Sequence, residues 1–308
     1  MTLLYKADPA RGRRWAELFA QKAPGIELRL WPDVGDPADI RYLSAWTLEP
    51  GLLERFPNLE ILFSIGAGVD QLDLSVVPEP VIVVRLVETG LADGMAEYVA
   101  MSVLALHRHL FDYTAQQAEQ RWKSIPQTPA AKRRVGIMGL GQMGEASLQA
   151  LSAFGFALRG WSRSPRDIPG VDCFHSQAQF ADFIGGCDIL VCLLPLTDTT
   201  RGIMDASLFA LLPPGASIVN AGRGGHLVED DLLAALASGQ VSRAVLDVTQ
   251  VEPLPAGHAL WSHPRVVVTP HAASATDADG AGRALIANLQ RYIAGGELVG
   301  RVDRNRGY

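Results

Sequence analysis

The sequence has little of what secreted, membrane-spanning and nucleic-acid-binding proteins need. Its three cysteines, Cys173, Cys187 and Cys192, lack metal-ligand spacing and leave an odd thiol. We therefore predict no metal site and a reducing compartment, the cytoplasm by default. No apolar run reaches the roughly 18 residues of a membrane span, and the first residues do not resemble a signal peptide. With 27 basic and 33 acidic residues, the net charge of −6 argues against a nucleic-acid partner and favours a small-molecule ligand.

The composition indicates a globular chain with room for two domains. Of 308 residues, 48% are hydrophobic and 19% are charged. Short apolar runs alternate with stretches of helical period, which is typical of α/β folds with mostly parallel sheets. We predict an α/β fold with two domains.

The expected strands form two groups along the chain. The first group comprises Leu3–Tyr5, Ile26–Leu30, Tyr42–Ala45, Ile61–Ile65 and Val81–Val84, and the second comprises Val135–Met138, Phe156–Trp161, Ile189–Leu194, Ser217–Asn220, Ala244–Asp247 and Val266–Thr269. We expect helices over Arg13–Ala23, about 95–118 and about 281–294. The last of these helices is expected to pack back on the first domain.

A dinucleotide fingerprint follows the first strand of the second group. Gly139-Leu140-Gly141-Gln142-Met143-Gly144 continues the run Val135–Met138 and opens a helical stretch. In such a motif Gly139 permits a tight turn, Gly141 lets the backbone approach a pyrophosphate, and Gly144 brings helix close to strand. The alternative is a glycine-rich turn in another kind of βα unit.

The end of the next strand, about 20 residues on, discriminates between NAD and NADP. Instead of an acidic residue for the ribose 2′-OH, the sequence has Ser162-Arg163-Ser164, followed by Arg166. Hydroxyls and a guanidinium suit a 2′-phosphate, so we predict NADPH/NADP. Arg163 could instead be a solvated turn residue.

Polar residues follow three later strands, where open α/β sheets bind ligands. Arg223 follows Ser217–Asn220, Glu252 follows Ala244–Asp247, and His271 follows Val266–Thr269. An arginine fork can hold and polarise a 2-oxoacid, and a carboxylate beside an imidazole favours its protonated, proton-donating form. We predict that Arg223, Glu252 and His271 catalyse carbonyl reduction. Asp247 could bind the nicotinamide carboxamide or cap the next turn.

In the first domain, Ile61–Ile65 leads into Gly66-Ala67-Gly68-Val69-Asp70. Consecutive backbone N–H groups there could bind a carboxylate, although a plain tight turn is a close alternative. Trp46 could wall the same cleft or be a core tryptophan.

These motifs, in this order, resemble the D-isomer-specific 2-hydroxyacid dehydrogenase family over essentially the whole chain. The further matching landmarks are Leu194-Pro195-Leu196-Thr197, Asn220-Ala221-Gly222-Arg223-Gly224, Leu246-Asp247-Val248, Glu252-Pro253-Leu254-Pro255 and Thr269-Pro270-His271. Within the family, Trp161–Ser164, Val228–Leu233 and the tail Val302–Tyr308 are similar to the glyoxylate/hydroxypyruvate reductase A group.

The resemblance implies a domain organisation and a set of ligand contacts. It implies a smaller flavodoxin-like α/β substrate domain over 1–95 and 281–308, a doubly wound (Rossmann) cofactor domain over 96–280, and a homodimer with contacts on the helix after Met95. It implies substrate contacts from Trp46, Ala67 and Gly68, and NADPH contacts from Gly139, Gly141, Gln142, Met143, Ser162, Arg163, Ser164, Leu194, Pro195, Ala221 and Asp247. The segment Ala272-Ala273-Ser274 departs from the family's usual pattern after the histidine, which leaves the shape of the substrate pocket open.

Three other interpretations are weighed against this one. The 3-hydroxyacid dehydrogenases share the fingerprint but use a later lysine, whereas the only lysines here, Lys6, Lys22, Lys123 and Lys132, all precede it. A non-catalytic NADP(H)-sensing protein could share the fold. Pyruvate or phenylpyruvate could replace glyoxylate and hydroxypyruvate as substrate.

Overall fold

The computed structural model describes residues 1–274 and 277–304 and divides the chain into two compact units. Unit 1 comprises Met1–Leu91 with Thr276–Tyr308, and unit 2 comprises Ala92–Ala275. Their boundaries lie four and five residues before the predicted ones, 95/96 and 280/281. The end of the sequence motif at the C-terminus, 305–308, lies outside the described residues.

Unit 1 is built around a five-stranded parallel sheet in the order β2-β1-β3-β4-β5. This is the flavodoxin-like order. The strands are β1 (Thr2–Lys6), β2 (Glu27–Leu30), β3 (Ile40–Ala45), β4 (Ile61–Ser64) and β5 (Ile82–Val84), and the helices are α1 (Pro9–Lys22) and α9 (Ala278–Ile293). All five predicted strands of the first group are therefore present, each shifted by no more than two residues at either end.

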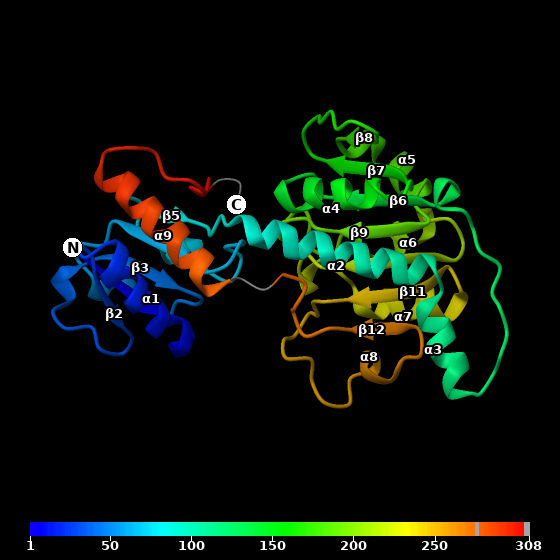
Figure 1. Cartoon of the computed structure of the whole chain (residues 1–308), viewed down its shortest axis with the longest axis horizontal. Helices are drawn as coiled ribbons and strands as arrows, with labels where there is room; N and C mark the ends of the chain where they lie inside the picture. The colour runs from blue at the N-terminus through cyan, green and yellow to red at the C-terminus, as the bar shows by residue number, and fades with distance from the viewer. Residues whose placement is uncertain (275–276, 305–308) are drawn as a thin grey trace. The chain divides into compact units, whose positions relative to one another are not determined.

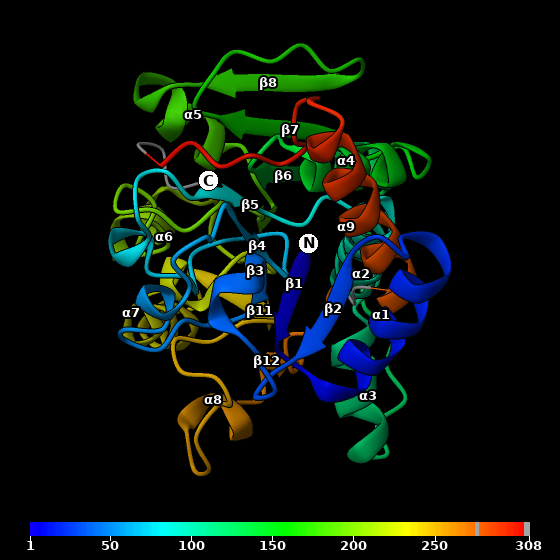
Figure 2. The ribbon, with the colours of Figure 1, turned by 90° about the vertical axis from the view of Figure 1, so that its left-hand side faces the viewer.

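The late helix α9 packs against α1, as the sequence predicts, and both views show the two side by side (Figures 1 and 2). Asp8 caps α1, with its side chain accepting from the Arg11 N–H at 2.8 Å. Trp15, 1% exposed, donates its indole N–H to the Ala278 carbonyl at 2.7 Å. A buried indole that reaches a backbone acceptor in this way fixes the docking of the two helices.

Unit 2 holds a seven-stranded sheet in the order β12-β11-β10-β9-β6-β7-β8, parallel throughout. The strands are β6 (Arg134–Met138), β7 (Ala157–Ser162), β8 (Val171–His175), β9 (Ile189–Cys192), β10 (Ala216–Asn220), β11 (Val241–Leu246) and β12 (Val266–Val268). The helices are α2 (Thr89–His107), whose first residues belong to unit 1, α3 (Leu110–Ala118), α4 (Gln142–Ser152), α5 (Phe180–Gly185), α6 (Ala206–Leu211), α7 (Glu229–Ser238) and α8 (Ala259–Ser262). This is the doubly wound order of a Rossmann fold, with its switch point between β6 and β9.

Two predictions for unit 2 are wrong. The edge strand β8 was not expected, because Val171–His175 is short, mixes polar with apolar residues and is only partly buried. The single helix over 95–118 is two helices, since His109 adopts the left-handed conformation (φ 58°) between α2 and α3. The turn lets Asp112 of α3 pair with Arg243 of β11 at 2.6 Å.

The sheet of unit 2 has an apolar core on each face. Its strands read as nearly continuous apolar runs, as expected for parallel strands buried on both sides. No helix in the described ranges is long and apolar enough to cross a lipid bilayer.

Candidate active site

The glycine fingerprint lies at the switch point of unit 2, where β6 and β9 are neighbours. Gly139 has a φ of +104°, and a Cβ there would lie 2.7 Å from the Leu193 carbonyl oxygen. A Cβ on Gly144 would lie 1.9 Å from the Gly139 oxygen, so only glycine allows α4 to start this close to β6. Gly141 caps α4 and faces open space, with nothing within 4 Å of a Cβ. The geometry fits a pyrophosphate at the helix N-terminus.

The predicted 2′-phosphate residues lie at the end of β7: Ser162 is its last residue and half-buried, and Arg163 and Ser164 follow it and are exposed. Ser162 donates its hydroxyl to the Ser164 carbonyl at 2.7 Å, which shapes the turn, and Arg163 is exposed. Arg166 lies 3.4 Å from Glu145 of α4, and both side chains are about half exposed, at 50% and 47%. The three residues Ser162-Arg163-Ser164 at the end of β7 carry no carboxylate of their own.

The remaining predicted cofactor residues differ in exposure. Gln142 and Pro195 are exposed, and Met143 is half-buried against the core. The side chains of Leu194 and Ala221 belong to the core, at 8% and 6% exposure. If these two residues meet a cofactor, they do so through their backbone.

The predicted catalytic residues come from loops after three neighbouring strands, β10, β11 and β12. His271 and Glu252 are joined by a 2.7 Å bond between Nδ1 and Oε2. The second carboxylate oxygen of Glu252 accepts from the Thr249 N–H at 3.2 Å. Because a carboxylate accepts, Nδ1 carries a proton and Nε2 is left as the nitrogen that can exchange one. Both side chains are partly open to solvent, at 39% and 38%.

The loop that carries Arg223 packs against the loop that carries Glu252. A Cβ on Gly224 would lie 1.8 Å from the Thr249 carbonyl oxygen, so the two loops touch at backbone distance. Within the loop, Asn220 donates to the Arg223 carbonyl at 3.1 Å, and the Arg223 N–H donates to Nδ1 of His226 at 3.0 Å. His226 is fully buried. Its ring nitrogen holds the backbone of Arg223, a role that the sequence does not predict.

Asp247 caps the loop of His271, which is the second of its two predicted alternatives. It is 2% exposed, and its carboxylate accepts from the Thr269 hydroxyl at 2.6 Å and from the Ala272 and Ala273 N–H groups at 2.8 and 2.9 Å. The His271 N–H also donates to the Asp247 carbonyl at 2.8 Å. These bonds hold His271 in a left-handed conformation with a φ of 52°. A contact between Asp247 and a cofactor stays a prediction.

The loops of His271 and Glu252 each have a support that could not be found from sequence. Tyr98 of α2 lies 2.7 Å from the Thr269 hydroxyl, which itself donates to Asp247, so Tyr98 is the donor. Glu229, at the start of α7, accepts from the Gln250 N–H at 3.0 Å and lies 3.3 Å from Nε2 of His258. These two contacts fix the chain before and after Glu252. Pairs this far apart in sequence leave no local signal.

In unit 1 the glycine loop Gly66–Gly68 follows β4, and the side chain of Ser64 holds its backbone in place. Ser64 accepts from the Gly66 N–H at 3.1 Å and donates to the Gly68 carbonyl at 2.7 Å. No hydrogen bond among the described residues uses the N–H of Ala67 or Gly68. Trp46 is 40% exposed and covers Gly66, where a Cβ would lie 2.8 Å from its ring. The structure thus brings Trp46 and the loop together.

Comparison with known proteins identifies the family of the chain. Residues 100–273 match the family model described as D-isomer specific 2-hydroxyacid dehydrogenase, NAD binding domain. The chain is 38% identical to glyoxylate/hydroxypyruvate reductase A of Yersinia enterocolitica, with all of both chains covered.

Solved structures show the same two-domain fold. A D-isomer specific 2-hydroxyacid dehydrogenase from Xanthobacter autotrophicus, in complex with NADPH and MES, is 38% identical with a TM-score of 0.93, covering 100% of this chain and 99% of that one. An NADPH-dependent glyoxylate/hydroxypyruvate reductase from Sinorhizobium meliloti, in complex with NADP and sulfate, is 36% identical with a TM-score of 0.93 and the same coverage. The chain belongs to the D-isomer specific 2-hydroxyacid dehydrogenase family.

Proposed function

We propose that the protein is an NADPH-dependent reductase of small 2-oxoacids, which converts glyoxylate to glycolate and hydroxypyruvate to D-glycerate. The observation that carries this proposal is the 2.7 Å bond between His271 and Glu252, on loops next to that of Arg223 in a unit with a dinucleotide fingerprint. The reductases of Yersinia and Sinorhizobium support the substrate and the cofactor.

In this mechanism His271 supplies the proton. NADPH, when bound, supplies the hydride that the carbonyl carbon accepts, and charge then develops on the carbonyl oxygen. Nε2 of His271 donates its proton to that oxygen, while Glu252 orients the ring and stabilises the imidazolium. Arg223 holds the carboxylate and polarises the carbonyl with its planar fork. The N–H groups of Ala67 and Gly68 bind the substrate carboxylate.

The residues of unit 2 fit a bound NADPH. We infer that Gly139, Gly141 and the first turn of α4 hold the pyrophosphate, and that Ser162, Arg163 and Ser164 hold the 2′-phosphate. Unit 2 is therefore the proposed cofactor domain and unit 1 the proposed substrate domain.

We also infer a homodimer in the cytoplasm. Met101 on α2 and Leu110 on α3 are each 55% exposed, and Trp122 beyond α3 is fully exposed. We infer that these residues contribute to an apolar patch of the kind that marks subunit contacts. All three cysteines are free thiols, which suits a reducing compartment. Sedimentation at micromolar concentration tests the dimer, and a monomer there contradicts it.

A steady-state assay tests the function. We expect NADPH consumption with glyoxylate and hydroxypyruvate, with slower turnover of pyruvate and phenylpyruvate.

Replacing His271 with Ala should lower kcat by roughly two to four orders of magnitude, the usual contribution of a general acid, and leave NADPH binding intact. Arg223→Lys should also lose activity, because a point charge cannot replace the fork. Binding of NADPH without turnover of any 2-oxoacid would instead indicate a sensor.

A further inference from the structure

Arg85 of unit 1 has a guanidinium group without a protein partner. It follows β5 directly and is half-buried, and among residues 1–274 and 277–304 it has neither an ion pair nor a side-chain hydrogen bond. Burial lowers the pKa of Arg85, and no neighbouring carboxylate opposes this shift. Two other arginines of unit 1 are engaged: Arg41 pairs with Glu60, and Arg304 donates to the Val77 carbonyl at 2.7 Å.

The position of Arg85 is fixed by its surroundings. The backbone N–H of Arg85 donates to the Gly300 carbonyl at 2.9 Å. A Cβ on Gly300 would lie 3.4 Å from Cγ of Arg85. Gly300 has a φ of +83°, so the backbone and the side-chain stem of Arg85 are packed against a turn that requires glycine. The stem is therefore held while its charged end lacks a partner.

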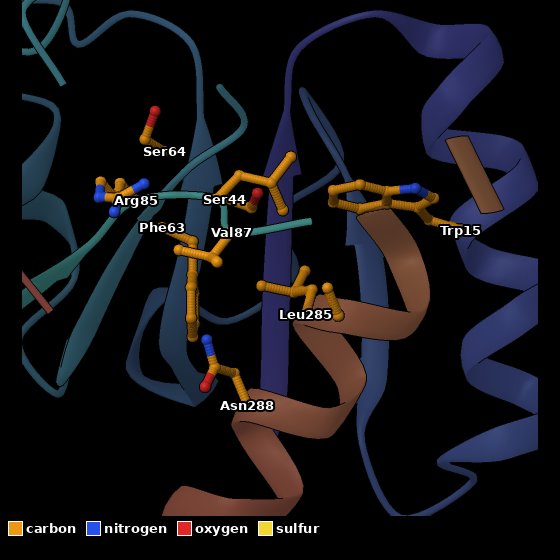
Figure 3. A pocket seen from close by; sticks show the side chains of 10 residues that line it. Trp15, Ser44, Phe63, Ser64, Arg85, Val87, Leu285 and Asn288 are labelled. Atoms are coloured by element: carbon orange, nitrogen blue, oxygen red, sulfur yellow. The ribbon is translucent and has the colours of Figure 1, made fainter. Parts of the chain in front are cut away.

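Arg85 lies at the same sheet edge as the glycine loop. β3, β4 and β5 are neighbours, and they lead into Trp46, the Gly66–Gly68 loop and Arg85 respectively. The Leu86 N–H donates to the Gly66 carbonyl at 3.0 Å, which ties the segment of Arg85 to that loop. Arg85 and Ser64, the residue that braces the loop, also line one cavity of about 10 Å³, which Figure 3 shows from close by. A cavity of this size holds about one water molecule, so any larger ligand must lie outside it.

A guanidinium removed from water without a counter-charge is unfavourable for folding. Its fork matches the geometry of a carboxylate, with two parallel N–H donors. An unpaired fork at the same sheet edge as backbone N–H groups that also lack acceptors points to an anion as the shared ligand.

We propose that Arg85 is a specificity-determining residue that binds the carboxylate of the 2-oxoacid together with the N–H groups of Ala67 and Gly68. This inference rests on the proposed function and adds to it a second cation, from unit 1, for the substrate anion.

The test compares Arg85→Met with Arg85→Lys and with Arg13→Met as a matched control. Methionine keeps much of the packed stem and removes the charge, lysine restores the charge without the fork, and Arg13 is an exposed arginine on α1 of the same unit. The probe is oxamate, a non-reducible 2-oxoacid analogue, titrated calorimetrically into the enzyme saturated with NADPH. The KM values for glyoxylate and NADPH are measured in parallel.

For Arg85→Met we expect oxamate affinity to fall and the glyoxylate KM to rise by roughly 10- to 100-fold, the range for a lost charged hydrogen bond. The NADPH KM and the apparent melting temperature of the ligand-free protein should not worsen, whereas a purely structural arginine would lose stability. For Arg85→Lys, oxamate affinity and the glyoxylate KM should lie between those of wild type and Arg85→Met. For Arg13→Met, both should match wild type.

Oxamate affinity within threefold of wild type in a folded Arg85→Met variant would overturn the inference. The wild-type protein could also reduce no 2-oxoacid and yet lose oxamate affinity on Arg85→Met. That result would overturn the proposed function and leave the anion site standing.

Discussion

Replacing Asp247 with Asn tests whether one buried carboxylate positions the proposed proton donor. Oδ1 accepts from Thr269 and from the Ala272 N–H, and Oδ2 accepts from the Ala273 N–H. An amide has one acceptor oxygen, so in either orientation at least one of these donors faces an NH2 group. The arrangement that retains most bonds keeps Oδ1 and sacrifices the bond to Ala273.

The expected cost is the loss of one hydrogen bond to a charged acceptor plus one unsatisfied buried donor, together about 2–5 kcal/mol. Unit 2 is in the size range where 1 kcal/mol shifts the melting temperature by about 2–4 °C, so a decrease of at least 4 °C or so is expected. His271 donates its N–H to the Asp247 carbonyl, so the loop that carries the imidazole should shift. Misplacement by about 1 Å lowers kcat by roughly 100-fold.

Differential scanning calorimetry and steady-state kinetics with glyoxylate give the two readouts. Tyr98→Phe is the control, because it removes only the outer bond to Thr269 and leaves the carboxylate intact. It should cost about 1 kcal/mol and reduce kcat much less. An Asp247→Asn protein with unchanged melting temperature and kcat would refute the reasoning.

Three further predictions concern the cofactor, the stability and the cysteines. Arg163→Ala should raise the KM for NADPH much more than that for NADH, and an equal loss for both contradicts a 2′-phosphate contact. Burial alone would raise the pKa of Asp188, but hydrogen bonds and charge from Arg134 outweigh it and lower that pKa. The pair therefore stabilises the fold above the unfolded carboxyl pKa of about 3.9 and loses this effect as the pH falls through the lower folded value. Asp188→Asn should cost about 1–2 kcal/mol at pH 7 in urea unfolding and much less at about pH 3, while an equal cost at both values contradicts the sign. Burial raises the pKa values of Cys187 and Cys192 to about 12. At about pH 8 iodoacetamide should therefore label the partly exposed Cys173 first. Labelling of Cys192 before Cys173 would contradict the burial of Cys192.

Local sequence patterns were enough to predict most of the fold. The apolar runs of the central strands and the glycines of the fingerprint each have a short-range physical cause, and the structure has them where they were expected. No glycine or proline marks the helix break at His109 in the sequence. The break is favoured by the pair between Asp112 and Arg243, which are far apart in the chain and leave no local pattern. The edge strand β8 was missed because an edge needs little apolar surface.

The candidate site was predictable only in its reacting groups. Arg223, Glu252 and His271 follow strand ends, and strand ends can be found in a sequence. Two of their supports, Tyr98 and Glu229, lie on other elements, and the bonds from Tyr98 to Thr269 and from Glu229 to Gln250 span 171 and 21 residues. The role of Asp247 needed the structure as well, because the same residue type at a strand end suits either a ligand contact or a cap.

The central claim is hydride transfer to a 2-oxoacid with His271 as proton donor, and isotope transfer tests it most directly. The enzyme is mixed with glyoxylate and with NADPH deuterated at the transferring position, and glycolate is analysed by mass spectrometry. The account predicts glycolate heavier by one mass unit, formed in step with cofactor oxidation, and almost none from the His271→Ala protein. Unlabelled glycolate, or labelled glycolate formed at the wild-type rate without His271, would contradict it.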